Sequence, residues 1–362
     1  MSGGDLKNTP LGPVNVPAVL VALLAGLIIG VVAQPIFASE PEPPTPATPV
    51  RPAGPGGNGP TGPDDGRATP VAGTAALQRA LARGVAKAEK MGGSAAVAVA
   101  APDFELTEGS VGPYRMWSTS KVLTSLILLS RLKPNEGVPP EIEDALVRSS
   151  NCAQRLIVNE IQDRLGGIEA AKRAFVDEAA KGRAKVDAST IQDDPPDDST
   201  CDAYLSAAGI GDPQRPTALF GPAEWTVGDA ARFMYSLGSG AFGPVGDEVL
   251  LTMKEKKQVN QDEGADNSVV AALDWGAGEV FGEVPYKAGW GMTRDEGLFT
   301  ASQMAVMNVG GRPVGVAAVF TTTGSRESEA LGEGREAEAI EAMFERVRKG
   351  LERVENGGGD GN

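Results

Sequence analysis

Hydrophobic and polar positions divide the chain into an apolar N-terminal segment, a proline-rich stretch and a long region with globular patterning. Residues 16–33 read VPAVLVALLAGLIIGVVA and contain no charge. About 18 to 20 such residues can cross a bilayer core as a helix, and soluble helices rarely stay apolar on every side for so long. We therefore expect a transmembrane anchor or signal segment over 16–38, after a short cytoplasmic tail over 1–15.

The residues around this segment indicate its orientation. Lys7 precedes it and acidic residues follow from Glu40. This order favours an N-terminus on the cytoplasmic side of the membrane and a folded domain on the outer side. If the segment is instead a signal peptide, cleavage after Ala33 or Ala38 would release a secreted protein. Residues 39–73 are dense in Pro, Gly and Thr and cannot bury enough apolar surface to fold, so we expect a disordered linker.

The region 74–355 has the patterning of a single folded domain, and the residues after it, 356–362, are expected to form a disordered tail. Apolar residues at helical spacing predict helices over 75–90, 122–132, 226–237 and 336–354. Buried runs rich in β-branched residues predict strands over 95–101, 104–108, 284–290, 301–308 and 313–322. The stretch 141–180 is helical in pattern, with a break at Gly166-Gly167, and 187–216 is loop-like and acidic. A helical block thus separates the first strands from the last, which predicts an α/β domain.

Composition narrows the possible functions. The formal charge is −15 over 362 residues, which argues against a nucleic-acid partner because phosphate binding needs a basic face. The chain has no histidine, so a Ser-His-Asp triad and histidine-ligated zinc are excluded, and we expect neither a metal nor another cofactor. Cys152 and Cys201 both lie in the exported part, where either a disulfide or two buried free thiols would be compatible with the sequence.

Ser118-Thr119-Ser120-Lys121 stands at the head of the apolar helix expected over 122–132. A serine hydroxyl is a poor nucleophile until a neighbouring base takes its proton, and without histidine a lysine must be that base. Residues i and i+3 share a helix face, so Ser118 and Lys121 are expected to be neighbours. Ser130 and Lys133 repeat the spacing at the far end of the helix, where the lysine is expected to be solvated. Ser118 could equally be a plain N-cap.

Two further sequence motifs could belong to the same site as Ser118 and Lys121. Ser149-Ser150-Asn151 can present a hydroxyl for proton relay and an amide for a substrate carbonyl, although such a triplet is also a common polar turn. Lys287-Ala288-Gly289 lies on an expected strand, where the lysine can bind a carboxylate and the glycine lets a substrate backbone approach. Its alternative is a solvent-facing strand lysine before a turn.

The three patterns together, in the order S-x-x-K, S-x-N and K-x-G in an exported chain without histidine, resemble the penicillin-recognising serine enzymes, which include class A β-lactamases and D-Ala-D-Ala carboxypeptidases or transpeptidases. The resemblance covers about residues 74–354, and its most specific stretch is MWSTSKVLTSLILLSRL. It implies a β-lactamase/transpeptidase-like fold, in which an antiparallel sheet with flanking helices carries an inserted all-helical subdomain.

The resemblance also implies roles for individual residues. Ser118 would be the acylated nucleophile, Lys121 its base or base partner, and Ser149 the relay of a proton to the leaving nitrogen. The substrate would be bound by Asn151, Lys287 and Gly289, and the backbone N–H groups of Ser118 and Trp290 would form the oxyanion hole. The expected partner is a β-lactam or a peptidoglycan stem peptide, bound by a monomeric protein.

Two departures from the family pattern keep three functions open. Ala288 stands where the family usually has Thr or Ser in contact with a substrate carboxylate. The E-x-x-L-N pattern, whose glutamate activates the deacylating water of class A β-lactamases, is not found between Asn151 and Thr226, although Asp187, Asp193 and Asp194 lie near the expected place. The leading expectation is a membrane-anchored serine hydrolase resembling class A β-lactamases. The alternatives are a D-Ala-D-Ala carboxypeptidase or penicillin-binding protein, and a catalytically degenerate member that binds the cell wall.

Overall fold

The structure, a computed structural model, describes residues 73–194, 201, 217–255, 276–293, 297–323 and 335–355. The chain separates into two units, residues 1–65 and 66–362, and every described element belongs to the second. The expected anchor over 16–38, the linker up to residue 72 and the tail over 356–362 lie outside the described residues. Across the part that is described, no helix combines the length and the apolar character needed to cross a membrane.

The centre of the domain is a five-stranded antiparallel sheet with the strand order β2-β1-β9-β8-β7. The strands are β1 (Ser94–Ala100), β2 (Glu105–Gly109), β7 (Tyr286–Thr293), β8 (Leu298–Val309) and β9 (Arg312–Thr323). The early and late parts of the chain meet where β1 pairs with β9 along its whole length. This pairing leaves β7 at one edge of the sheet, and the candidate site forms along that edge.

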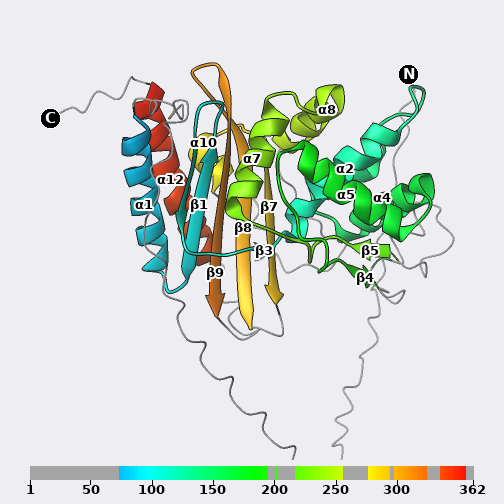
Figure 1. The fold of residues 1–362 in the computed structure, drawn as a ribbon, viewed down its shortest axis with the longest axis horizontal. Coiled ribbons are helices and arrows are strands. Elements are labelled where there is room, and N and C mark those ends of the chain that lie inside the picture. The colour runs from blue at the N-terminus through cyan, green and yellow to red at the C-terminus, as the bar shows by residue number, and fades with distance from the viewer. Residues whose placement is uncertain are drawn as a thin grey trace, which may run out of the picture. The chain divides into compact units, whose positions relative to one another are not determined.

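Two long helices cover one face of the sheet. α1 (Thr74–Glu89) and α12 (Arg335–Glu355) lie side by side at the left of Figure 1, and the short α10 (Ala277–Phe281) belongs to the same layer. Their buried side chains, such as Leu81 and Phe344, pack on Val97 and Val99 of β1. The expected first and last helices are therefore the partners that bury this face, and each of their ends differs by one residue from the end expected.

The opposite face carries the described elements between residues 114 and 254 (Figure 1). α7 (Val227–Gly238) lies directly on the sheet, so close that a Cβ at Gly315 of β9 would be 2.1 Å from the carbonyl oxygen of Ala231. Beyond it, α2 (Ser120–Arg131) is surrounded by other helices and shares one apolar core with them. These helices are α3 (Pro140–Leu146), α4 (Asn151–Leu165), α5 (Ile168–Lys181) and α8 (Gly243–Lys254). Because α2 is covered on nearly every side, its sequence is apolar almost all round.

The predicted fold class, an antiparallel sheet with flanking helices and a helical insertion, is confirmed by this arrangement. The insertion also contains short strand pairs that the sequence analysis did not assign: β3 (Tyr114–Arg115) with β6 (Glu224–Trp225), and β4 (Gln192–Asp194) with β5 (Thr217–Leu219). Two- and three-residue strands give no periodicity to detect. The β3–β6 pair matters for the site because β3 leads directly into the Ser118 segment.

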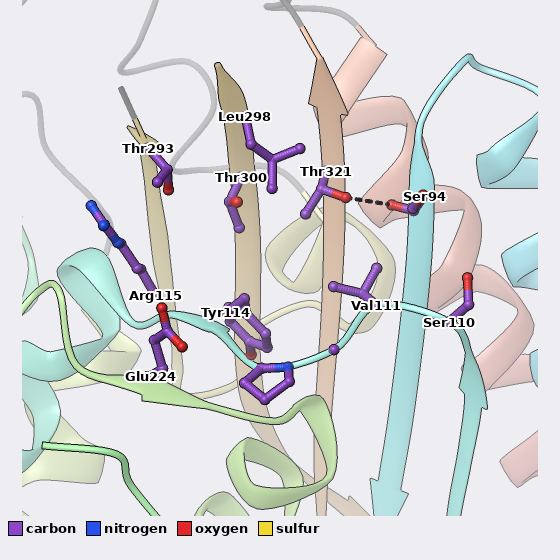
Figure 2. A pocket seen from close by; sticks show the side chains of 12 residues that line it. Ser94, Ser110, Val111, Tyr114, Arg115, Glu224, Thr293, Leu298, Thr300 and Thr321 are labelled. Atoms are coloured by element: carbon purple, nitrogen blue, oxygen red, sulfur yellow. Dashed lines mark hydrogen bonds between the residues drawn. The ribbon is translucent and has the colours of Figure 1, made fainter. Parts of the chain in front are cut away.

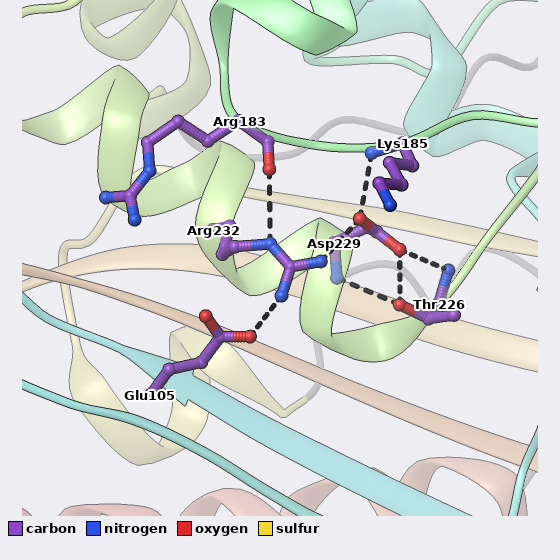
Figure 3. Close-up of polar contacts among 6 residues, drawn as sticks. All are labelled: Glu105, Arg183, Lys185, Thr226, Asp229 and Arg232. Atoms are coloured by element: carbon purple, nitrogen blue, oxygen red, sulfur yellow. Dashed lines mark hydrogen bonds and ion pairs between the residues drawn. The ribbon is translucent and has the colours of Figure 1, made fainter. Parts of the chain in front are cut away.

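A polar network anchors the start of α7 to the rest of the domain (Figure 3). Thr226 caps the helix in a capping box with Asp229. The Asp229 carboxylate also accepts a hydrogen bond from the backbone N–H of Lys185 at 2.8 Å and pairs with Arg232 at 2.5 Å, while Arg232 contacts Glu105 of β2. Burial opposes ionisation of Asp229, but the hydrogen bonds from Thr226, Lys185 and Arg232 outweigh it, so the pKa of this carboxyl lies below its usual value.

Candidate active site

Ser118 lies in a single 3₁₀ turn, η1 (Trp117–Thr119), between β3 and α2. Two backbone hydrogen bonds fix the entry to this turn: Met116 N–H donates to Ala223 O and Trp117 N–H donates to Gly221 O, both at 2.8 Å. Trp117 has a φ of 47°, in the left-handed region that a bulky residue rarely adopts. Such a conformation costs of the order of 1–3 kcal/mol and persists only where the surroundings enforce it. The serine expected at the helix N-terminus is thus on a constrained turn just ahead of α2.

Lys121 is the nearest base to this serine. Its Nζ lies 3.1 Å from Ser118 Oγ, as the i, i+3 spacing predicts, and the side chain is only 2% exposed. The same nitrogen lies 2.8 Å from Asn151 Oδ1 and contacts the carbonyl oxygen of Ser149. The lysine is therefore held in place by acceptors at the start of α4 and in the loop before it, with its nitrogen directed at the hydroxyl.

Ser149 ends the connection between α3 and α4. It adopts a φ of 57°, while the next residue, Ser150, caps α4 by accepting a hydrogen bond from Ala153 N–H at 3.0 Å. The left-handed residue turns the chain so that the Ser149 hydroxyl and the Asn151 amide both face Lys121, at 3.4 and 2.8 Å from Nζ. The two serines thus have different tasks: Ser150 begins the helix, and Ser149 presents its hydroxyl to the site.

Lys287 completes the cluster from the edge strand β7. Its Nζ lies 2.8 Å from Ser149 Oγ, across 138 residues of sequence, and its side chain is 2% exposed. Two buried lysine side chains therefore converge on one hydroxyl. Positive charge this close lowers the cost of a developing anion and favours a ligand carboxylate.

Two glycines of β7 allow the strand to approach the serine turn. A Cβ on Gly289 would lie 2.7 Å from Met116 O, and a Cβ on Gly291 would lie 2.5 Å from the ring of Trp117. Both are distances that real Cβ atoms essentially never show. Gly289 was expected from the sequence to admit a substrate backbone, and in the structure it admits the backbone of η1. Gly291 was not recognised as part of the site, because a single glycine on a strand gives no sign of what it faces.

The backbone N–H of Trp290 points away from the sheet. Val306 N–H donates to Pro285 O at 3.0 Å, so the pairs at 287/304, 289/302 and 291/300 carry the ladder hydrogen bonds of β7 and β8. The alternate N–H groups, including that of Trp290, face the free edge of β7. Ser118 N–H belongs to the first residues of a helical turn, which have no partner within it. Both donors expected for an oxyanion hole are thus on backbone that borders the cluster.

The structure also shows where Ala288 and the three aspartates named from the sequence lie. Ala288 is buried and has no hydroxyl to offer a carboxylate. Asp187 is exposed, and its carboxylate accepts a hydrogen bond from the backbone N–H of Ser189 at 2.8 Å. Hydrogen bonds from Ser189 hold the pKa of this carboxyl below its usual value. Asp193 and Asp194 lie in β4, and their side chains are outside the described residues.

The two cysteines form a disulfide in the structure. Cys152 and Cys201 have Cα atoms 5.3 Å apart, and both residues are buried against Leu156. Cys152 immediately follows Asn151 at the start of α4, so the bridge fixes residue 201 beside the helix end that serves the site. The sequence left the choice between disulfide and free thiols open.

Comparison with known proteins finds matches among solved structures only. No protein-family model and no curated protein sequence matches the chain. Among solved structures, a class A β-lactamase from Bacteroides cellulosilyticus is 14% identical, with a TM-score of 0.46, over 75% of this chain and 99% of the other. The chromosome-encoded β-lactamase of Vibrio parahaemolyticus is 17% identical, with a TM-score of 0.45, over 74% of this chain and 99% of the other. The transpeptidase domain of a D,D-transpeptidase from Legionella pneumophila is 12% identical, with a TM-score of 0.45, over 76% of this chain and 95% of the other.

Proposed function

We propose that the chain is a serine acyl-enzyme that reacts with β-lactams, with Ser118 as its nucleophile and Lys121 as its base. The observation that carries this proposal is the 3.1 Å separation of Lys121 Nζ and Ser118 Oγ in a chain without histidine. A base within hydrogen-bond reach of a hydroxyl, itself oriented by further polar groups, is the arrangement that nucleophilic catalysis requires. Here Asn151 and the Ser149 carbonyl orient the base.

In the proposed acylation, neutral Lys121 takes the hydroxyl proton while Ser118 Oγ attacks the lactam carbonyl carbon. The negative charge that develops on the carbonyl oxygen is stabilised by the N–H groups of Ser118 and Trp290. As the C–N bond breaks, Ser149 gives its proton to the leaving nitrogen and takes up the proton that Lys121 removed from Ser118, since Lys121 Nζ lies 3.4 Å from Ser149 Oγ. Lys121 is then neutral again, and Lys287, 2.8 Å from Ser149 Oγ, stabilises the negative charge that develops during this transfer. The product is an ester on Ser118 with the ring opened. Hydrolysis of that ester by water would complete a β-lactamase cycle.

A second acyl donor, a peptidoglycan stem peptide ending in D-Ala-D-Ala, fits the same chemistry. The observation that favours it is Ala288, because the position offers no hydroxyl to a β-lactam carboxylate and Lys287 remains to attract a peptide carboxylate. The two proposals share acylation at Ser118 and differ in whether the ester of a β-lactam is released.

One assay separates these functions. The purified chain is incubated with the chromogenic β-lactam nitrocefin, and the protein mass is followed at the same time. Rapid turnover supports a β-lactamase, and a stable adduct on Ser118 supports a penicillin-binding peptidase. Neither turnover nor adduct, with retained binding of a muropeptide, would mean a cell-wall-binding protein without catalysis. Ser118→Ala must lose both signals, while Ser130→Ala, a matched serine at the exposed end of α2, must keep them.

We also propose that the folded domain works outside the cytoplasm, held to the cell membrane by residues 16–38 or released from it. The proposal is supported by the uncharged run over 16–33 and by the Cys152–Cys201 disulfide, because disulfides persist mainly in oxidising compartments. Protease added to intact cells should digest the domain if it is exported. Protection of the domain until the membrane is permeabilised would contradict this.

A further inference from the structure

A cavity of about 300 Å³ lies on the inner face of the sheet, beside the serine turn rather than at it. Its walls come from the ends of four strands and from the chain segment that runs through β3 into η1 (Figure 2). At roughly 30 Å³ per water molecule, the volume corresponds to about ten water-sized groups. This is the lower end of the range for small-molecule sites, and Ser118 is not among the lining residues.

The floor of the cavity is a row of hydroxyl groups across the sheet. Thr300 lies opposite Thr321 in the register of β8 and β9, and Thr321 lies opposite Ser94 of β1. On the other side, Thr300 lies opposite Gly291 of β7. Paired residues share a face and alternate residues repeat it, so this row is on the same face as Lys287. Thr300 and Thr321 are buried and Ser94 is exposed, and the Thr321 hydroxyl also donates to the Ser94 carbonyl oxygen at 3.5 Å. The row therefore offers polar contacts to an occupant of the cavity.

One cation lines the cavity beside this row. Arg115 extends from β3 toward the end of β7 that carries Thr293 (Figure 2). Its guanidinium stacks on the ring of Trp117, 5.7 Å from the ring centre, and its Nε is buried without a hydrogen-bond partner among the described residues. A buried donor without a partner is uncommon. Because a guanidinium can only donate, the missing partner is an acceptor, and a carboxylate is the acceptor that matches its geometry best.

The cavity is close to Ser118 along the chain. Residues 115 and 118 are three apart, so their Cα atoms are separated by at most about 11 Å. Trp117 lies between them and packs its ring on Gly291. Glu224 also lines the cavity, and its charge disfavours a carboxylate on its own side. The favourable position for a bound carboxylate is therefore at the guanidinium, toward Thr293.

We propose that this cavity is a second recognition site for the acyl donor, which binds a carboxylate at the far end of the acyl side chain through Arg115 and the adjoining polar atoms through the hydroxyl row. This inference rests on the proposed acylation of Ser118, since the donor must be attached there for its side chain to enter. It defines a substrate class: acyl donors with an extended side chain that ends in an anion.

Two penicillins test this proposal because they differ only at the end of the side chain. In one the side chain is adipoyl, which ends in a carboxylate, and in the other it is hexanoyl, which ends in a methyl group. The measurement is the second-order rate constant for acylation of Ser118, followed by intact-protein mass. We expect the wild-type chain to prefer the adipoyl compound by about tenfold, the effect of one charge-assisted hydrogen-bonded pair.

The variants identify the groups responsible. Arg115→Gln should bring the preference to about 1, Arg115→Lys should retain part of it because the charge remains, and Thr300→Val should reduce it. Arg131→Gln, which alters an exposed arginine at the end of α2, should leave the wild-type preference unchanged. Using a ratio of two donors cancels any general loss of activity caused by disturbing Trp117.

The outcomes separate this inference from the function on which it rests. Equal acylation by the two penicillins, or an undiminished preference in Arg115→Gln, would overturn the second site and leave the proposed function intact. If neither compound acylates Ser118, the proposed function fails, and calorimetric binding of the two compounds to the unmodified chain then decides on the cavity. Tighter binding of the adipoyl compound that Arg115→Gln abolishes would support a carboxylate site, and equal or absent binding would overturn it.

Discussion

Lys121 Nζ lies 3.1 Å from Ser118 Oγ, and both side chains are carried on the first turn of one continuous helical segment. If Lys121 is the base, Lys121→Met should lower the rate of acylation by penicillin about 10²- to 10⁴-fold, the usual contribution of a positioned general base. Lys133→Met is the matched control, because Lys133 follows Ser130 at the same spacing and its side chain is 76% exposed. Acylation of Lys121→Met at the parental rate would contradict the mechanism.

Substitutions of the adjacent residues Ser149 and Ser150 should have different effects, the first on acylation and the second on stability. Ser149→Ala removes the hydroxyl 2.8 Å from Lys287 Nζ, so acylation should slow by about 10- to 1,000-fold with little change in the free energy of unfolding. Ser150→Ala removes the cap of α4 and should cost about 1 kcal/mol of stability, with acylation retained. Denaturant unfolding and acylation measured on both variants provide the check. The opposite assignment of losses would show that Ser149 is only structural.

Gly291 should be irreplaceable for reasons of space. A Cβ there would lie 2.5 Å from the Trp117 ring, so Gly291→Ala must displace the ring or the edge of β7. We expect a loss of about 1–3 kcal/mol in unfolding free energy, together with slower acylation, because Trp117 adjoins the nucleophile. Gly137→Ala is the control, since nothing lies within 4 Å of a Cβ at that position. Equal stability of the two variants would show that β7 and η1 are not closely packed.

The residues of the candidate site could be predicted from the sequence more fully than the contacts among them. The Ser118–Lys121 contact follows from helical spacing alone, and the apolar runs located the main helices and strands to within a few residues. The meeting of Lys287 with Ser149 follows from no local rule, because it depends on the sheet bringing β7 beside the start of α4. It was expected only from resemblance to a family.

Other features left no trace in the sequence pattern. Arg115 sits on a two-residue strand, and its neighbours in the cavity come from β7, β8 and β9 and from β1, whose Ser94 is 227 residues from Thr321 in the chain but opposite it in the sheet. Helix α8 was not assigned, because its glycines and Pro244 weaken the helical pattern and its buried residues are few. In both cases tertiary packing, rather than local preference, determines the structure.

The disulfide should stabilise the helical block. Replacing Cys152 and Cys201 together by serine should lower the unfolding free energy by about 2–4 kcal/mol, because the bridge closes a long loop and so restricts the unfolded chain. Reduction of the unmodified chain should have a comparable effect, and it should not alter the double variant. Thermal unfolding with and without dithiothreitol measures both. Identical melting of the oxidised and reduced chain would show that the bridge contributes nothing.

Asp229 should make the stability of the domain depend on pH in the acid range. Its folded-state pKa is below its usual value, so its contribution is present above about pH 3.9, the value in an unfolded chain, and is lost as pH falls through the folded pKa. Asp229→Asn should therefore destabilise the domain by about 2–4 kcal/mol at pH 7, since it leaves Arg232 and the Lys185 N–H with a weaker acceptor in a buried place. The difference in unfolding free energy between Asp229→Asn and wild type should shrink below pH 4, as the native carboxyl also becomes neutral.

Asp187→Asn is the matched control, because that carboxyl also has a lowered pKa but is exposed to solvent. Urea unfolding of the three proteins between pH 3 and pH 7 would test this, and a penalty for Asp229→Asn that stayed constant over the range would show that the charge of Asp229 is not what holds α7 in place.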